Sequence, residues 1–273
     1  MRILMIGDIV GKPGRSILVR ALPNLIRQER LDLVVANGEN AAAGSGITPV
    51  IYRELVAAGV DCVTLGDHIY RRAEIIGVLQ RETNIVKPAN YPAEAPGREF
   101  AIVNARNGIA VAVISLMGRV FMKPMDCPFR AADRVLSQIP AETRIRLVDF
   151  HAEATSDKQL LGRYLAGRVS AVVGTHTHVP TADEEILPGG TAFQCDLGMT
   201  GPHDSILGRR IERVQETTLN FIPTHFDVAT GDVRLNGSII EVERTTGKAT
   251  AIRRICIREA DLPAGDIPRL AEE

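Results

Sequence analysis

The sequence predicts an α/β fold in which a mixed sheet, or more than one, is flanked by helices. Short apolar runs alternate with amphipathic stretches over the first half of the chain, and the last third is mostly β-like. Strands separated by helices indicate βαβ units and a largely parallel sheet. Later antiparallel strands are expected to join it. Since no linker divides the chain cleanly, we expect a single domain over residues 1–273.

The elements of the first third follow from hydrophobic periodicity. Short apolar runs predict strands over residues 2–6, 33–36, 60–65 and 84–86. Apolar side chains at helical spacing predict a helix over residues 14–30. A second helix is expected from Pro49 to about Ala58, because Thr48 is a good cap and proline suits the first turn.

The middle of the chain combines a hairpin with further α/β elements. Asn107-Gly108 between the apolar runs 100–104 and 109–115 predicts a β-hairpin. Prolines indicate loops over residues 87–98 and 120–129, and a helix is expected over 131–138. Ser156 to Gln159 fits a capping box that opens a helix to about Ala166. Strands are expected over residues 146–150 and 170–173.

The end of the chain is expected to be mostly β. Strands are predicted over residues 192–195, 218–221, 239–242 and 251–257, with turns at 230–232 and 246–248. Four separated cysteines without a CxxC pair predict reduced, mostly buried thiols rather than a disulfide framework.

The charge balance excludes a strong global attraction to nucleic acid or to a membrane. Lys plus Arg number 32 and Asp plus Glu number 33, so the net charge is −1. Aromatic residues are 4% and tryptophan is absent, which does not support a stacking platform for single-stranded nucleic acid. No apolar run reaches the roughly 20 residues of a membrane helix, and no signal peptide is evident. We expect a cytoplasmic protein, with a homo-oligomer left open.

Polar side chains follow five of the predicted strands. The sequences at these points are Gly7-Asp8, Asn37-Gly38-Glu39-Asn40, Gly66-Asp67-His68, Asp149-Phe150-His151 and Gly174-Thr175-His176-Thr177-His178. Ligands bind outside the carboxyl ends of strands in open α/β sheets, so these side chains should converge if the strands are parallel neighbours. By contrast, Gly7, Gly11 and Lys12 do not form a phosphate loop, because the spacing is wrong and Pro13 follows.

The side chains at the strand ends predict a metal site. Carboxylates and imidazoles donate lone pairs to divalent cations. The candidates are Asp8, Glu39, Asn40, Asp67, His151, His176 and His178. Seven ligands fit two ions that share one carboxylate, and such a pair promotes phosphoryl chemistry. His68 is then available as an acid or base, while His203 and His225 are expected to have no role in the site.

These motifs resemble those of the calcineurin-like metallophosphoesterases, and most of all a bacterial YmdB-like subgroup. The supporting stretches include residues 37–42, 90–92, 149–156, 174–178 and 198–202, and together they span about residues 2–210. The resemblance implies a layered calcineurin-like fold with its active site at the carboxyl ends of the strands. It also places Asp196, Thr200 and Gly201 near the site without assigning them a role.

The resemblance further implies a two-metal phosphodiesterase that acts on small-molecule 2′,3′-cyclic nucleotides, with iron or manganese as the metals. His68 would donate the proton to the leaving ribose oxygen. Glu39 would bridge the two ions. The implied ligands are Asp8, Glu39, Asn40 and His178 for metal one, and Glu39, Asp67, His151 and His176 for metal two.

Two positions depart from the family patterns. The wider superfamily has Asp-x-His in its first motif, whereas this chain has Asp8-Ile9-Val10, an absence that the YmdB-like subgroup shares. That subgroup generally has Asn where this chain has Asp67. The extra negative charge should tighten metal binding and raise the pKa of bound water, and we expect Asp67 still to ligate.

Two other functions remain open. One is a broader phosphomonoesterase or nuclease that uses the same metals, which an assay series over cyclic, monoester and linear diester substrates would separate. The other is a non-catalytic regulator that binds a nucleotide or acts as an RNA-processing partner.

Overall fold

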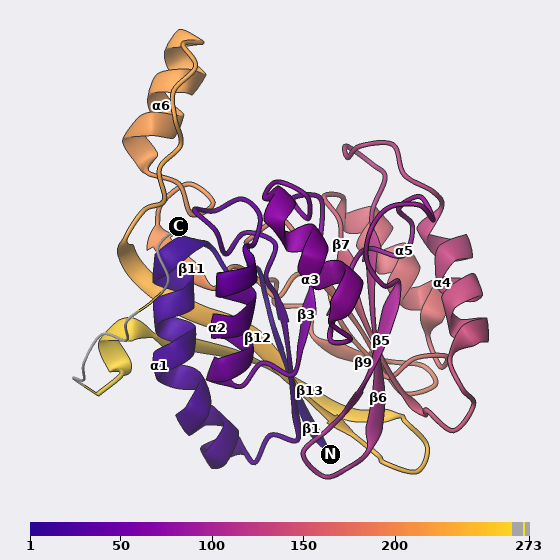
Figure 1. Ribbon diagram of the computed structural model, residues 1–273. Helices are drawn as coiled ribbons and strands as arrows, with labels where there is room; N and C mark the ends of the chain where they lie inside the picture. Colours follow the sequence, from indigo (N-terminus) through magenta and orange to yellow (C-terminus); the bar gives the residue numbers. More distant parts are fainter. Residues whose placement is uncertain (264–269, 271–273) are drawn as a thin grey trace.

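The computed structural model describes residues 1–263 and residue 270. Two mixed β-sheets form the middle of the molecule, with helices on their outer faces (Figure 1). This confirms the prediction of mixed sheets flanked by helices. The domain predicted over residues 1–273 includes residues 264–269 and 271–273, which lie outside the described residues.

The first sheet has seven strands and contains most of the early parallel elements. Its order is β11 (Gly201–Asp204), β12 (Gly231–Val242), β1 (Arg2–Ile6), β2 (Leu33–Asn37), β3 (Cys62–Thr64) and β4 (Ile85–Val86), and β13 (Ala249–Arg258) pairs with β12. Strands β1 to β4 are parallel to one another, and β12 joins β1 in the antiparallel direction. The late strands therefore extend the early parallel sheet, as predicted.

The second sheet has six strands. Its order is β5 (Phe100–Asn104), β6 (Ala110–Met117), β7 (Ile145–His151), β8 (Ala171–Thr175), β10 (Thr191–Gln194) and β9 (Glu185–Leu187). The predicted hairpin joins β5 and β6, and strands β6, β7 and β8 are parallel. Strands β9 and β11 were not expected from the sequence.

Alternate residues of β1 show how the layers pack. Ile3 and Met5 belong to an apolar cluster shared with the second sheet, whereas Leu4 and Ile6 belong to a cluster that includes helical residues. The helices of that outer layer are α1 (Gly11–Glu29), α2 (Pro49–Ala58) and α3 (Ile76–Arg81). The opposite layer contains α4 (Pro128–Gln138) and α5 (Thr155–Leu165). The order of layers is therefore helix, sheet, sheet, helix.

The predicted strand over residues 218–221 is wrong. Residues Ile211–Asn220 form helix α6, which contains no buried residue and projects from the body of the molecule (Figure 1). Thr217 and Thr218 have β-branched side chains that favour a strand, but the segment lies outside both sheets, so no neighbouring strand pairs with it.

Two local signals were also misinterpreted. Helix α5 begins at Thr155, one residue before the predicted capping box, and Asp157 accepts hydrogen bonds from the backbone of Arg119 and Val120 at 3.2 Å. The turn predicted at residues 230–232 is instead the start of the long strand β12. The Thr48 cap is confirmed, because its hydroxyl accepts from the Ile51 amide at 3.3 Å.

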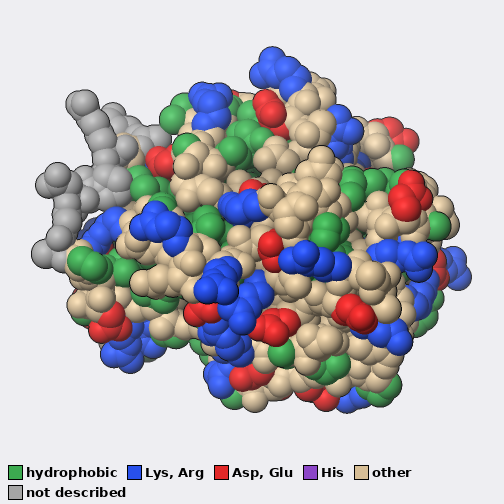
Figure 2. Space-filling model, turned by 90° about the horizontal axis from the view of Figure 1, so that it is seen from below, with side chains coloured by type: hydrophobic (Ala, Val, Ile, Leu, Met, Phe, Trp, Pro, Cys, Tyr) green, Lys and Arg blue, Asp and Glu red, His purple; other side chains and the backbone are tan. Residues whose placement is uncertain are grey.

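The surface carries mixed charge. Figure 2 shows the face seen from below, where Lys and Arg side chains are interspersed with Asp and Glu. In the described part of the chain, no helix is long and apolar enough to cross a membrane.

Candidate metal centre

The carboxyl ends of strands from both sheets meet at one edge of the molecule. Asp8 follows β1, Glu39 and Asn40 follow β2, and Asp67 follows β3, all in the first sheet. His151 is the last residue of β7 in the second sheet. The remaining candidates, His68, His176 and His178, lie on the loops after β3 and β8. All eight side chains lie together, although the strands that carry them belong to two sheets.

Four of these side chains form a compact group. One ligand atom from each lies within 4.8 Å of the others, in the set Glu39, Asp67, His151 and His176. The Nε2 atom of His151 is 3.1 Å from Glu39 Oε1, 3.2 Å from Asp67 Oδ1 and 3.0 Å from His176 Nδ1. These four residues are the ones that the family resemblance implies for metal two.

The residues expected around metal one lie directly beside this group. His178 Nε2 is 3.9 Å from Asp8 Oδ1 and 3.3 Å from Asn40 Nδ2, and the same amide nitrogen is 3.0 Å from Glu39 Oε1. The Asn40 oxygen faces His68 Nδ1 at 2.7 Å instead. A half-turn of the Asn40 amide is therefore needed before its oxygen can face Asp8 and His178.

The donor set fits cations. Asp8 is fully buried, and no hydrogen-bond donor in the described part of the chain reaches its Oδ1 atom. Its other oxygen accepts from the His176 amide at 3.0 Å. Buried polar atoms are nearly always paired, so an orphaned carboxylate oxygen beside buried Glu39 and partly buried Asp67 indicates a place for positive charge.

The electrostatics of the cluster agree with this conclusion. Burial raises the pKa of Asp8 to about 8. Burial also opposes ionisation of Glu39, but the nearby His151 outweighs it and lowers the pKa of Glu39 well below its usual range. For His151, burial lowers the pKa, but the negative charge of Glu39 and the other nearby carboxylates raises it. The net result is a pKa well above the usual range for histidine. Burial therefore opposes the negative charge of Asp8, whereas the charge of Glu39 is balanced by His151 and His68.

A buried hydrogen-bond chain, called the relay below, orients the ring of His151. Its Nδ1 atom lies 2.9 Å from Thr175 Oγ1, and that hydroxyl donates to Asp149 Oδ1 at 2.7 Å. In neutral His151, a proton on Nδ1 leaves the Nε2 lone pair directed at the cluster. Asp149 also accepts from Asn37 and Thr64 of the first sheet, so the relay joins the two sheets behind the site.

A buried ion pair supports the loop that contains His176 and His178. These two residues have φ angles of 95° and 64°, in the left-handed region that non-glycine residues rarely adopt. Between them, Thr177 donates its amide and its hydroxyl to Asp196 Oδ2 at 3.2 and 2.7 Å. Lys158 Nζ lies 2.6 Å from the same oxygen, and both charged side chains are buried.

The cluster opens into a cavity of about 250 Å³. Its lining combines the site with residues from elsewhere, namely Glu39, Asn40, Gly44, His68, Glu153, His176, Thr177, His178, Leu207 and Arg209. Glu153 Oε2 lies 3.1 Å from His176 Nε2, so a carboxylate faces the ring nitrogen opposite the cluster. The cavity is therefore lined both by candidate ligands and, at its rim, by other side chains.

Sequence reasoning missed several residues of this site. Asp149 was visible in the Asp-Phe-His motif but was not assigned, and Glu153 lies in a stretch used only for the resemblance. No local signal connects Lys158 with Asp196, or Leu207 and Arg209 with the cavity, because these contacts depend on the packing of distant segments.

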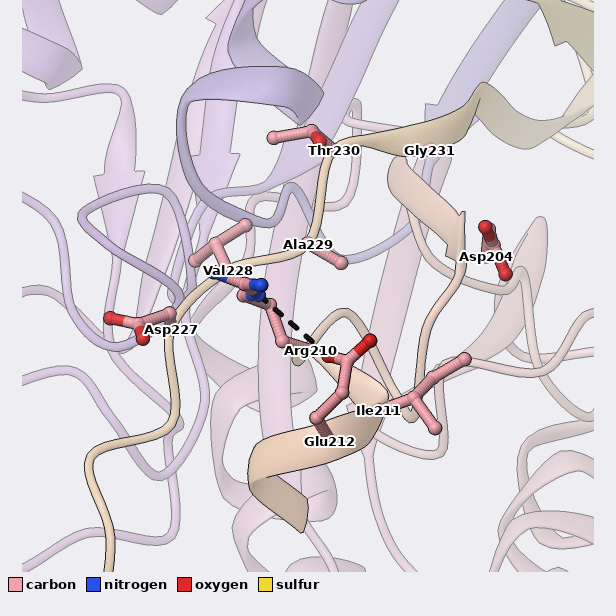
Figure 3. Close-up of a pocket in the computed structure, with 9 residues that line it drawn as sticks. All are labelled: Asp204, Arg210, Ile211, Glu212, Asp227, Val228, Ala229, Thr230 and Gly231. Atoms are coloured by element: carbon pink, nitrogen blue, oxygen red, sulfur yellow. Dashed lines mark ion pairs between the residues drawn. The ribbon is translucent and has the colours of Figure 1, made fainter. Parts of the chain in front are cut away.

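A second cavity, of about 490 Å³, lies at the base of α6 (Figure 3). It is lined by Asp204, Arg210, Ile211, Glu212, Asp227, Val228, Ala229, Thr230 and Gly231, and Arg210 Nε is 3.8 Å from Glu212 Oε2. None of the eight predicted site residues lines it. Although this cavity is larger than the one beside the cluster, it is therefore not the candidate site.

Comparisons with known proteins find relatives that match nearly the whole chain. A family model described as YmdB-like protein matches residues 4–255. The chain is 46% identical to the 2′,3′-cyclic-nucleotide 2′-phosphodiesterase of Bacillus subtilis (strain 168), over 95% of this chain and 98% of that protein. It is 31% identical to a putative phosphatase/phosphodiesterase of Mycoplasma pneumoniae, over 96% and 94% of the two chains.

Two solved structures share the fold. One is a hypothetical protein from Thermus thermophilus, with a TM-score of 0.89, 43% identity and coverage of 95% of this chain and 100% of that one. The other is a novel phosphatase from Mycoplasma pneumoniae, with a TM-score of 0.88, 30% identity and coverage of 94% and 93%.

Proposed function

Because the chain belongs to the YmdB-like protein family, we propose that it is a metal-dependent phosphodiesterase that hydrolyses 2′,3′-cyclic nucleotides to nucleoside monophosphates. The observation that carries this proposal is the group formed by Glu39, Asp67, His151 and His176, whose ligand atoms lie within 4.8 Å of one another. The activity named for the Bacillus subtilis relative supports the substrate class.

The proposed site would hold two cations, and Glu39 would contribute to holding both. Asp8, Asn40 and His178 would complete one position, and Asp67, His151 and His176 would complete the other. Imidazoles and oxygen donors suit iron or manganese. When bound, such a pair neutralises charge on the phosphate and lowers the pKa of a water molecule.

His68 is the proposed proton donor to the departing ribose oxygen. Its Nδ1 atom lies 2.7 Å from Asn40 Oδ1, an acceptor that favours a proton on Nδ1. Burial opposes protonation of the ring, but Glu39 and Asp67 outweigh it and raise the pKa of His68. The protonated ring then presents Nε2–H, and 27% of the side chain is exposed, so a substrate can reach it.

A substrate series tests this function. We expect preference for 2′,3′-cyclic nucleotides over nucleoside monophosphates and linear diesters, together with loss of turnover when metal is removed. His68→Ala should lower the rate roughly 10²–10⁴-fold, the usual contribution of one acid–base group. His225→Ala is the control, since that side chain is 87% exposed and lies outside the cluster.

The outcomes separate the alternatives. Preference for monoesters would identify a phosphomonoesterase, and preference for linear diesters a nuclease. Nucleotide binding with no turnover at any metal concentration would identify a regulator, and each of these results would contradict the proposal.

A further inference from the structure

The turn formed by residues 206–209 makes one wall of the site cavity. The backbone amides and carbonyls of Ile206 and Arg209 bond reciprocally, each at 2.9 Å. The carbonyl oxygen of Leu207 lies 3.1 Å from His178 Nδ1, which donates to it. The turn is therefore fixed against a residue of the cluster, and its side chains have a defined position at the rim.

The Arg209 guanidinium is held flat against the backbone. Its Nη1 atom donates to the carbonyls of Ala43 and Phe226, both at 2.8 Å, and Nη2 donates to the Gly44 carbonyl. A Cβ on Gly44 would lie 2.6 Å from Cζ, 2.6 Å from Nη1 and 2.7 Å from Nη2. Such nearly equal distances place that point over the guanidinium plane rather than at its edge. The lack of a side chain at Gly44 therefore leaves room for the planar guanidinium to pack against the backbone.

Leu207 contributes an apolar surface beside this cation. Its side chain is 52% exposed, and its φ angle is 51°. A non-glycine residue in this conformation is strained and persists only where its surroundings hold it, as they often do at ligand-binding sites. Leu207 and Arg209 both line the cavity that contains Glu39 and His68.

The size of the cavity indicates what this rim contacts. Ligand pockets usually measure about 300–1,000 Å³, whereas this cavity is about 250 Å³. A nucleotide whose phosphate reaches the cluster therefore fills this small cavity and contacts its lining, which includes Leu207 and Arg209. Nucleobases are recognised by stacking on arginine planes and against apolar side chains.

From this geometry, and resting on the proposed function, we infer that Leu207 and Arg209 form the subsite for the nucleobase of the substrate. The guanidinium supplies a flat cationic surface, and the leucine supplies apolar contact. The subsite determines which cyclic phosphodiesters are bound well, and it takes no part in the transfer of protons.

Two substrates with the same five-membered phosphodiester ring test the subsite. Adenosine 2′,3′-cyclic phosphate has a base, whereas glycerol 1,2-cyclic phosphate has none. The variants are Arg209→Gln and Leu207→Asn, the second chosen because asparagine adopts the left-handed conformation readily. The control is Arg210→Gln, since Arg210 lines the separate cavity at the base of α6 (Figure 3).

We expect the wild-type protein to have a higher kcat/KM for the adenosine substrate. Each variant should lower the ratio of the two kcat/KM values about tenfold, mainly through KM; for Arg209→Gln this lies within the roughly 2–30-fold range that cation–π energies imply. Arg210→Gln should leave the ratio within about twofold of wild type.

Two results would overturn the inference while leaving the proposed function intact. These are an unchanged ratio in both variants, with or without an equal loss on both substrates, or no preference for the base in the wild-type protein. If neither cyclic substrate is hydrolysed, the proposed function fails and the subsite is tested by calorimetry. Adenosine 3′-monophosphate should then bind about tenfold more tightly than inorganic phosphate, and Arg209→Gln should remove that difference; equal affinities would overturn the subsite.

Discussion

The Oε1 atom of Glu39 lies 3.1 Å from the Nε2 atom of His151, although Glu39 follows a strand of the first sheet and His151 ends a strand of the second. Both side chains are buried. This contact joins the carboxyl edges of β2 and β7, so the candidate metal centre exists only when the two sheets are stacked. Ligand geometry and the apolar packing between the sheets therefore depend on each other.

Asp67→Asn replaces a carboxylate with a neutral amide of nearly the same shape. Loss of one negative charge, 3.2 Å from His151 Nε2, should weaken metal affinity on the order of 10–100-fold, the scale of changes around metal sites. A cation with less negative charge around it is a stronger Lewis acid, so kcat at saturating metal should be maintained or raised. Metal titration and steady-state kinetics measure both quantities. A loss of kcat with unchanged metal affinity would contradict this role.

Gly66→Ala should disrupt the cluster by overlap. A Cβ at this position would lie 2.3 Å from His151 Cδ2 and 2.4 Å from Glu39 Oε2. Overpacking of this kind costs about 1–3 kcal/mol, and here the displaced groups are proposed ligands. We expect lower metal content and activity, measured by elemental analysis and kinetics.

Gly77→Ala is the matched control for that substitution. It lies in helix α3, and its nearest neighbour is the flexible end of Arg81 at 3.2 Å. Alanine in a helix is favoured over glycine by up to about 1 kcal/mol. Metal content should stay at the wild-type level, and an equal loss in both variants would argue against a specific effect at Gly66.

Lys158→Met should weaken both the fold and the metal site. It leaves the buried Asp196 carboxylate without the cation that lies 2.6 Å away, and breaking a buried pair costs about 3–5 kcal/mol. Urea unfolding measures this loss. The double variant Lys158→Met/Asp196→Leu should recover part of the stability, because no lone buried charge remains.

Metal affinity should stay low in that double variant. The amide and hydroxyl of Thr177 lose their acceptor, so the backbone between His176 and His178 is no longer held. Recovery of metal affinity together with stability would show that the ion pair acts on the fold alone.

His203 should make stability depend on pH. Burial lowers its pKa in the folded protein and outweighs the Met199 carbonyl, which lies 3.1 Å from Nε2 and raises the pKa; Asn236 Nδ2 lies 2.9 Å from the same atom. The unfolded state binds the proton more strongly. The contribution of neutral His203 to the free energy of unfolding is therefore complete above about pH 6.5, and it is lost as the pH falls through the lowered pKa of the folded protein. Unfolding at pH 7.5 and 5.5 should show a smaller pH effect in His203→Gln. If the difference in stability between the two pH values is the same in His203→Gln as in wild type, His203 is excluded as the source of the pH dependence.

The convergence of the candidate residues was predictable because they stand at the ends of strands. Asp8, Glu39 and Asp67 each follow an apolar run, and parallel strands bring their carboxyl ends to one edge. The sequence could not indicate that His151 arrives from a second sheet, because alternating strands and helices are compatible with one sheet or two.

The supporting contacts were not predictable from local patterns. Lys158 and Asp196 are separated by 38 positions, and their pairing depends on how α5 packs beside the loop after β10. The strand expected over residues 218–221 shows the same limit, since local β-propensity had no neighbouring strand to pair with and helix α6 formed instead.

Elemental analysis of protein purified without chelator tests the metal centre most directly. We expect about two metal ions per chain in the wild-type protein, as a shared-carboxylate pair requires, and at most one in Glu39→Gln, because the proposed shared ligand is lost. Hydrolysis of a 2′,3′-cyclic nucleotide should fall in parallel. Wild-type protein that contains no bound metal and hydrolyses the substrate equally well in excess chelator would contradict the two-metal site.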